Sequence, residues 1–130
     1  MSFDLAVRPN TLGARTGSYT LTPSNGGPPL AVSMRATGIG PRFAATPAMI
    51  DFGGVKFGTP ISPVSVLLRN DGGGDLRLSA LTLTDTTNFA LENAPTLPNT
   101  LRGGGVQSVD VRFRPQSQGR FTGNLQVTYQ

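Results

Sequence analysis

The side chains of this chain that could do chemistry are few and scattered. Seven Asp and Glu residues stand without any His or Cys, which removes imidazole acid–base catalysis, thiol chemistry and most transition-metal sites. Asp71 and Asp75 flank a glycine-rich stretch, but the alternating oxygen ligands of a calcium loop are missing. Lys56 lies beside a turn and is expected to be solvated. Neither Gly72–Gly74 nor Gly103–Gly105 is followed by the Lys-Ser/Thr of a phosphate-binding loop. The sequence therefore predicts no enzyme, no catalytic or metal-binding residue and no cofactor.

Positive charge is in slight excess but is not concentrated. Eleven Lys and Arg against seven Asp and Glu give a net charge of +4, and ten of the eleven cations are Arg. Only Arg112 and Arg114 are close together, and aromatic residues do not interleave with the cations as base stacking requires. Solvated strand faces are the favoured interpretation. Arg-mediated binding to nucleic acid or to an anionic surface stays an alternative.

The opening residues of the chain repeat its closing residues. A shift of 106 positions lays Ser2–Ser24 over Ser108–Gln130 with eight identities in 23 pairs, where unrelated chains would give roughly one or two. The matches include the turn residues Arg-Pro and Thr-Gly, and apolar residues meet at alternate positions. One supersecondary unit is therefore used twice.

Short apolar stretches punctuated by seventeen Gly and eleven Pro predict an all-β chain. Strands of this length and spacing are typical of two packed antiparallel sheets, an immunoglobulin-like β-sandwich. A phase slip between Leu78 and Leu81 predicts a bulge near Ser79-Ala80, and Leu97–Gly105 is predicted to be a loop. The expected strands are Phe3–Arg8, Arg15–Thr22, a return strand through Leu30, Val32 and Met34, Arg42–Thr46, Ala48–Gly53, Val64–Arg69, Leu76–Leu78, a short strand at Phe89 and Leu91, Val106–Arg114, and a last strand through Phe121, Leu125, Val127 and Tyr129.

A linker at Gly38-Ile39-Gly40-Pro41 predicts two domains, because two permissive glycines and a proline interrupt any strand that crosses it. Residues 1–40 would be the closing strands of a preceding repeat. Residues 41–130 would be a β-sandwich that lacks its last strand.

Four motifs in order give the chain a resemblance to a known family. Ile50–Val55, Val66–Gly72, Val109–Pro115 and Gly119–Leu125 resemble successive signatures of the ASH domain family, an immunoglobulin-like and major-sperm-protein-like β-sandwich. The resemblance runs over Pro41–Gln130, and residues 31–38 resemble the strand that closes such a domain. It implies a structural and protein-binding unit, not a catalyst. It also implies a cell-surface or extracellular place, although the chain shows no signal peptide and its localisation is left unknown.

The departure from the family pattern predicts an open sheet edge. The second copy ends before its closing strand, and residues 28–37 of the same molecule are hard to use, because the four-residue linker spans at most ~14 Å. A strand from another molecule could then dock. The candidate strand-docking residues are Leu30, Val32, Met34, Phe121, Leu125, Val127 and Tyr129.

Three functional hypotheses follow. The first is a non-catalytic structural and protein-interaction module, a spacer or assembly unit of a tandem-repeat protein of bacterial type. The second is a self-assembling subunit of a filament or particle coat that works by intermolecular strand completion. The third is the Arg-mediated binding named above. The expected partners are proteins, either neighbouring repeats or other copies of the chain, with no small-molecule substrate, no membrane insertion and nucleic acid disfavoured.

Overall fold

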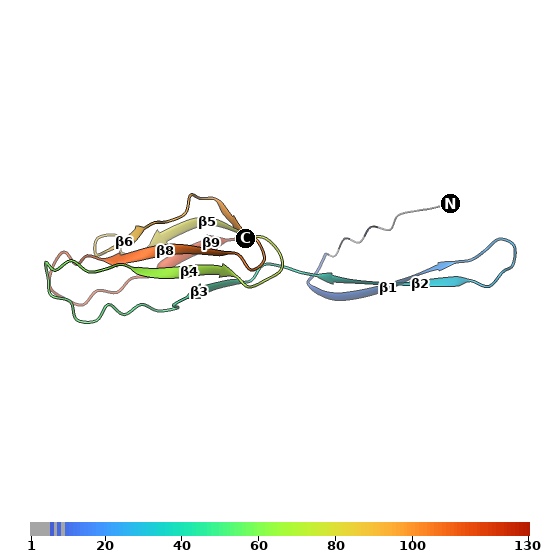
Figure 1. Ribbon diagram of the computed structural model, residues 1–130, viewed down its shortest axis with the longest axis horizontal. Coiled ribbons are helices and arrows are strands. Elements are labelled where there is room, and N and C mark those ends of the chain that lie inside the picture. The colour runs from blue at the N-terminus through green and yellow to red at the C-terminus, as the bar shows by residue number, and fades with distance from the viewer. Residues whose placement is uncertain (1–5, 7, 9) are drawn as a thin grey trace. The chain divides into compact units, whose positions relative to one another are not determined.

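A computed structural model describes Ala6, Arg8 and residues 10–130. The described residues form nine strands and no helix, and every strand pairing is antiparallel (Figure 1). The chain divides into an N-terminal unit, Met1–Gly40, and a C-terminal unit, Pro41–Gln130. The all-β prediction is confirmed.

The described residues of the N-terminal unit form a hairpin of two nine-residue strands, β1 (Gly13–Leu21) and β2 (Leu30–Gly38). Gly26 has a φ of 76° in the connection between them, the left-handed conformation that glycine adopts without strain. The amide of Gly27 donates to Asn25 Oδ1 at 3.2 Å. The predicted hairpin is therefore present. The strand expected at Phe3–Arg8 lies outside the described residues except for Ala6 and Arg8.

The C-terminal unit is built from two antiparallel sheets. One has four strands in the order β3-β4-β8-β6, and the other has three in the order β7-β5-β9. Their bounds are β3 Phe43–Thr46, β4 Val64–Asn70, β8 Val106–Phe113 and β6 Phe89–Glu92 in the first sheet, and β7 Asn99–Leu101, β5 Leu76–Leu83 and β9 Leu125–Tyr129 in the second.

The two sheets share one apolar core. Buried residues alternate with exposed ones along β4, where Val66 and Leu68 turn inward, and at the start of β5, where Leu76 and Leu78 do so. Burial on one side of each strand is what a sheet packed on a core requires. The remaining buried apolar residues are Leu101, Val109 and Val111. The arrangement is sandwich-like, with strands from both sheets contributing to the core.

The predicted irregularity in β5 is confirmed, because the pairing with β9 shifts register between Leu78 and Ala80. The strand expected at Ala48–Gly53 is wrong. This segment is irregular, and Asp51 Oδ1 accepts the amide of Gly53 at 2.8 Å, a local bond that competes with a sheet ladder. Gly53 also has a φ of 65°. Phe52 nevertheless packs against the core.

The loop expected over Leu97–Gly105 is also wrong in part, because it contains β7. This strand pairs three residues with Leu76–Leu78, and its last residue, Leu101, is buried. Core burial therefore orders a segment that is too short to show an alternating sequence pattern.

Candidate strand-docking edge

The candidate site is the outer edge of β9, the last strand of the β7-β5-β9 sheet. Thr84 N donates to Asn124 O at 3.0 Å, and Arg77 and Gln130 exchange backbone bonds of 2.9 and 3.1 Å. Alternate residues of a strand direct their backbone groups to opposite sides. The even-numbered residues therefore point to β5, and residues 125, 127 and 129 point to the outer edge. No described strand pairs with that edge, so these backbone groups are open to a further strand.

The side chains of β9 sit over the core at the same edge. Leu125 and Val127 are partly buried and pack against the core cluster. Tyr129 is 48% exposed, and its ring stacks on Phe43 of β3 with 4.7 Å between centroids. An added strand whose apolar residues faced the same way would cover Leu125, Val127 and Tyr129.

Phenylalanine rings line the inner side of the segment that leads into β9. Phe113 lies 5.5 Å from Phe52, 5.1 Å from Phe89 and 6.2 Å from Phe121 between ring centroids. A Cβ on Gly123 would come within 3.3 Å of two carbons of the Phe89 ring, so the backbone at residue 123 runs close over this cluster. Phe121, the first residue predicted for the β9 edge, therefore precedes the strand and contacts this group of rings through Phe113.

The other predicted docking residues lie on β2. Leu30 is 61% exposed, Val32 is 37% exposed and Met34 is half-buried. They are opposite Leu21, Tyr19 and Gly17 of β1, respectively. Most residues of both strands are exposed, and an isolated two-stranded sheet is marginally stable in water. The apolar side chains of β2 are therefore available to a further layer or strand. The two halves of the predicted set belong to different units of the chain, Leu30, Val32 and Met34 to the N-terminal unit and the others to the C-terminal unit.

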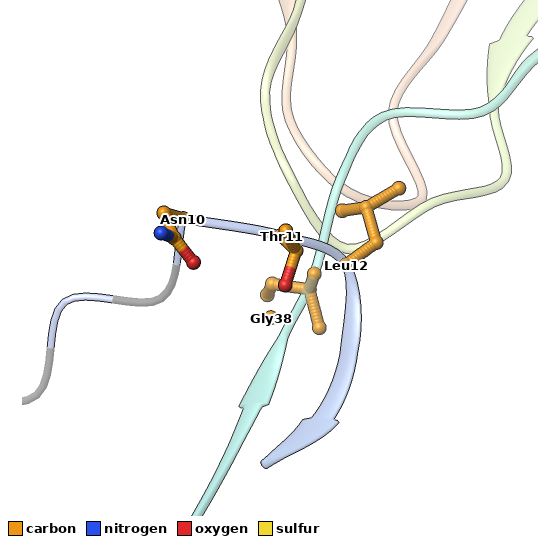
Figure 2. Close-up of a pocket in the computed structure, with 5 residues that line it drawn as sticks. Asn10, Thr11, Leu12 and Gly38 are labelled. Atoms are coloured by element: carbon orange, nitrogen blue, oxygen red, sulfur yellow. The ribbon is translucent and has the colours of Figure 1, made fainter.

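One end of the hairpin carries an open hollow of about 240 Å³ (Figure 2). It is lined by Asn10, Thr11, Leu12, Gly38 and Ile39, none of which has an ionisable side chain. A Cβ on Gly38 would lie 2.1 Å from Thr11 O, so the backbone before β1 crosses directly over the end of β2. Close backbone packing explains the glycine, and these lining residues offer no acid, base or cationic ligand.

Three carboxylates of the C-terminal unit are held by hydrogen bonds to neighbouring groups. Glu92 receives bonds from Arg112 Nε at 2.6 Å and from Arg112 Nη2 at 2.9 Å, while Arg112 Nη1 donates to Ile61 O at 2.8 Å. The hydrogen bond from Arg112 lowers the pKa of Glu92, and the same bond raises the pKa of Arg112. Asp85 accepts bonds from the side chain and amide of Asn88, and these bonds lower its pKa.

The third carboxylate, Asp110, joins two strands and a turn. It accepts bonds from Ser65 Oγ on β4 and from Asn93 Nδ2 at 2.6 Å. The bond from Ser65, and then that from Asn93, lower its pKa. In the part of the chain that the structure describes, no three acidic side chains gather where they could hold a metal ion. Asp71, considered above as a calcium ligand, pairs instead with Arg69 at 2.8 Å.

Sequence reasoning missed the two features that anchor the ends of β9 and β4. The Phe43–Tyr129 stack joins strands that are remote in sequence, and no local pattern reveals it. Asn70 is fully buried at the end of β4, and its two polar side-chain atoms, Oδ1 and Nδ2, both form hydrogen bonds with backbone groups. The signal for Asn70 was available, because an Asn just before Asp-Gly-Gly-Gly favours side-chain bonds to the turn that follows.

Comparisons with known proteins add no relative. No protein-family model, no curated protein and no solved structure matches the chain. A helix long and apolar enough to cross a membrane is not found among the described residues.

Proposed function

We propose that this chain is a non-catalytic structural and protein-interaction module, a spacer or assembly unit of a tandem-repeat protein. The observation that carries the proposal is the open edge of β9 on a unit that already has a packed core. An edge strand with unpaired backbone groups is a template for another strand, and a core that closes without it lets the unit persist while the edge is free.

The ionisable groups support a structural role. Glu92, Asp85 and Asp110 all have lowered pKa values, because each accepts hydrogen bonds from neighbouring side chains. A general acid or base at neutral pH needs the opposite environment, one that brings a carboxyl pKa upward. These carboxylates therefore favour connection of strands and turns over proton transfer.

The strand order supports an immunoglobulin-like version of the sandwich. In that fold, strands A, B, E and D form one sheet, and strands C, F and G form the other. The order β3-β4-β8-β6 matches A-B-E-D, and the neighbours β5 and β9 match C and F. Strand G would then lie on the outer edge of β9. The ASH family membership, a bacterial source and a place at the cell surface belong to the proposal as implications of the resemblance in sequence.

A strand appended to the chain tests the tandem-repeat proposal. In the first copy, the residues that follow the counterpart of Gln130 are 25–38, so a copy of this segment is added after Gln130. The module should then unfold at a higher temperature and denaturant concentration, because the sheet gains a strand and the core edge is covered.

The matched control carries the same extension with Asp at the copy of Val32. It has the same length and nearly the same composition, but it places a charge on the apolar face. Equal unfolding midpoints for the chain, the extended chain and the control would refute the proposal that β9 awaits a following strand.

A self-assembling filament or coat is the second candidate, and the same open edge favours it. The third hypothesis, binding through arginine, loses two of its cations to ion pairs, Arg69 with Asp71 and Arg112 with Glu92. Association that persists at high salt favours strand addition, whereas binding to phosphates weakens steeply as salt rises.

A further inference from the structure

We propose that a second copy of the chain completes the β7-β5-β9 sheet by pairing its β2 strand antiparallel with the outer edge of β9. This inference names the partner and the register of the edge on which the proposed function rests. The repeat within the chain identifies β2 as the strand that would occupy the edge. The counterpart of β9 in the N-terminal unit is β1, and β1 is paired with β2.

The internal repeat, together with the pairing of β1 and β2, predicts the register in which β2 would pair with β9. Position 127 corresponds to Leu21, position 125 to Tyr19 and position 123 to Gly17. In the hairpin these residues are opposite Leu30, Val32 and Met34. The same pairing on β9 therefore places Leu30 of the second copy opposite Val127, Val32 opposite Leu125 and Met34 opposite Gly123.

Backbone conformation supports the correspondence between β1 and the region of β9. Gly13 and Gly119 are equivalent in the repeat, and both have positive φ values, 101° and 147°. From this glycine, β1 runs as a strand for nine residues beside β2. The equivalent segment of the C-terminal unit becomes a strand only at Leu125. Residues 121–124 are the counterparts of Arg15–Ser18, which pair with β2 in the hairpin. A docked β2 would extend β9 toward its own N-terminal end.

The apolar faces match in this register. Residues directly opposite each other on antiparallel strands project to the same side of the sheet. Leu125 and Val127 pack against the core, so Val32 and Leu30 of the second copy would face the core edge as well. Met34 would come opposite Gly123, which packs closely on the Phe89 ring, since a Cβ there would lie 3.3 Å from two ring carbons. In the hairpin, Met34 already packs beside a glycine, because a Cβ on Gly17 would lie 3.6 Å from Met34 Cε.

Pairing in this register is a strand exchange. The edge of β2 that would meet β9 is the edge that β1 occupies in the hairpin, so β2 leaves β1 when it docks. Of the nine residue pairs that β2 makes with β1, those of Leu30 to Val32 would be replaced by β9 as it stands, and the others by residues 119–124 as β9 extends. The net gain is the burial of Leu30 and Val32, which are 61% and 37% exposed in the hairpin. The hairpin supplies little competing burial, since most of its residues are exposed. Exchange of an element between identical copies is a low-cost route to association.

The same molecule cannot supply β2 in this register. With Val32 opposite Leu125, Gly38 would lie six residues further along β2, about 20 Å from the level of Leu125. Tyr129 lies four residues from Leu125 in the opposite direction, about 13 Å away. Phe43 stacks on Tyr129, so the chain would have to cover about 33 Å between Gly38 and Phe43. Five residue steps reach about 18 Å when fully extended. The donor must be a second copy.

Cysteine pairs in this otherwise cysteine-free chain test the register. Gln126 corresponds to Thr20, which is opposite Ala31 in the hairpin. Both Gln126 and Ala31 are exposed. Because even-numbered residues of β9 point their backbone groups to β5, the new pair would be non-hydrogen-bonded, with Cα atoms about 4.5 Å apart, a distance that a disulfide spans. Single variants Gln126→Cys and Ala31→Cys are mixed, refolded together from urea and oxidised. We expect a covalent heterodimer as the main product.

The matched control replaces Ala31→Cys by Thr37→Cys, an exposed residue of the same strand. In the proposed register Thr37 lies six residues from the level of Gln126, about 20 Å away, beyond the reach of a disulfide. The heterodimer yield with Ala31→Cys should exceed that of the control severalfold. Equal yields would overturn the register. The mass of the unmodified chain should also rise with concentration in sedimentation experiments, and a monomer from micromolar to millimolar concentration would overturn the second copy as donor. The appended-strand experiment would still decide the proposed function, so the two failures are distinguishable.

Discussion

Removal of the Asn70 side chain should destabilise the C-terminal unit more than any other polar substitution in it. Asn70 Oδ1 accepts the amides of Arg42 and Gly72, both at 3.0 Å. Asn70 Nδ2 donates to Gly74 O at 2.6 Å and to Leu101 O at 2.9 Å. The residue is fully buried, and one side chain therefore joins the start of β3, the glycine-rich turn after β4 and the end of β7.

The size of the effect follows from the groups that Asn70→Ala leaves behind. An orphaned buried donor or acceptor costs about 1–3 kcal/mol. The bond to Leu101 O is buried and the other three are part-buried, so water can replace the latter in part. We expect a loss of about 4 kcal/mol, which is a large share of the 5–15 kcal/mol typical of a domain.

The assay is urea unfolding of the full chain, with Asn70→Asp as the second variant. The aspartate keeps an acceptor oxygen for the amides of Arg42 and Gly72. Its second carboxylate oxygen replaces the Nδ2 donor and faces the carbonyl oxygens of Gly74 and Leu101. Burial and these oxygens should raise its folded-state pKa above the unfolded value of about 3.9. The part of the penalty that comes from ionisation is then absent below that pH and grows as pH rises toward the folded-state pKa. A loss below about 1 kcal/mol for Asn70→Ala, the size of one ordinary hydrogen bond, would refute the role assigned to this residue.

Two further outcomes test the packing and the electrostatics. Gly103→Ala should cost about 1–3 kcal/mol in urea unfolding, because the new Cβ would lie 2.8 Å from Gly72 O. Its control is Gly54→Ala, which meets nothing within 4 Å and should be near neutral; similar losses for both would contradict the close approach. Glu92 has a lowered folded-state pKa because of Arg112, so its contribution to stability is present above the ordinary pKa of 4.5 and is lost as pH falls through the folded-state value. Glu92→Gln should flatten that acid dependence in pH-dependent unfolding, and an unchanged profile would count against the pair.

The alternation of apolar residues was enough to predict the strands that carry the core. Val66 and Leu68 of β4 and Val109 and Val111 of β8 alternate with polar residues, and the structure buries all four. The same reasoning predicted a strand around Phe52, where the pattern is apolar but the Asp51 carboxylate accepts the amide of Gly53 and turns the backbone. Periodicity reports which side chains are buried, and it does not report whether the backbone pairs.

The open edge was predictable for a different reason, namely the comparison of the chain with itself. The repeat shows a strand pair at residues 13–38 and only the first member of such a pair at the end of the C-terminal unit. The stack of Tyr129 on Phe43 and the bonds of Asn70 to the end of β7 could not be predicted, because they join elements far apart in sequence. Such contacts depend on how the sheets pack, and a single sequence does not specify that in any local pattern.

Amide hydrogen exchange along β9 tests the open edge most directly. In dilute solution the amides of Leu125, Val127 and Tyr129 should exchange rapidly, because they point to the unpaired side, while those of Gln126 and Thr128 should be protected by β5. At high concentration Leu125 and Val127 should become protected as β2 of a second copy docks, whereas Tyr129 lies beyond Leu30 in the proposed register and should stay exchangeable. Protection of all five amides in dilute solution would show that the edge is closed and would contradict the account.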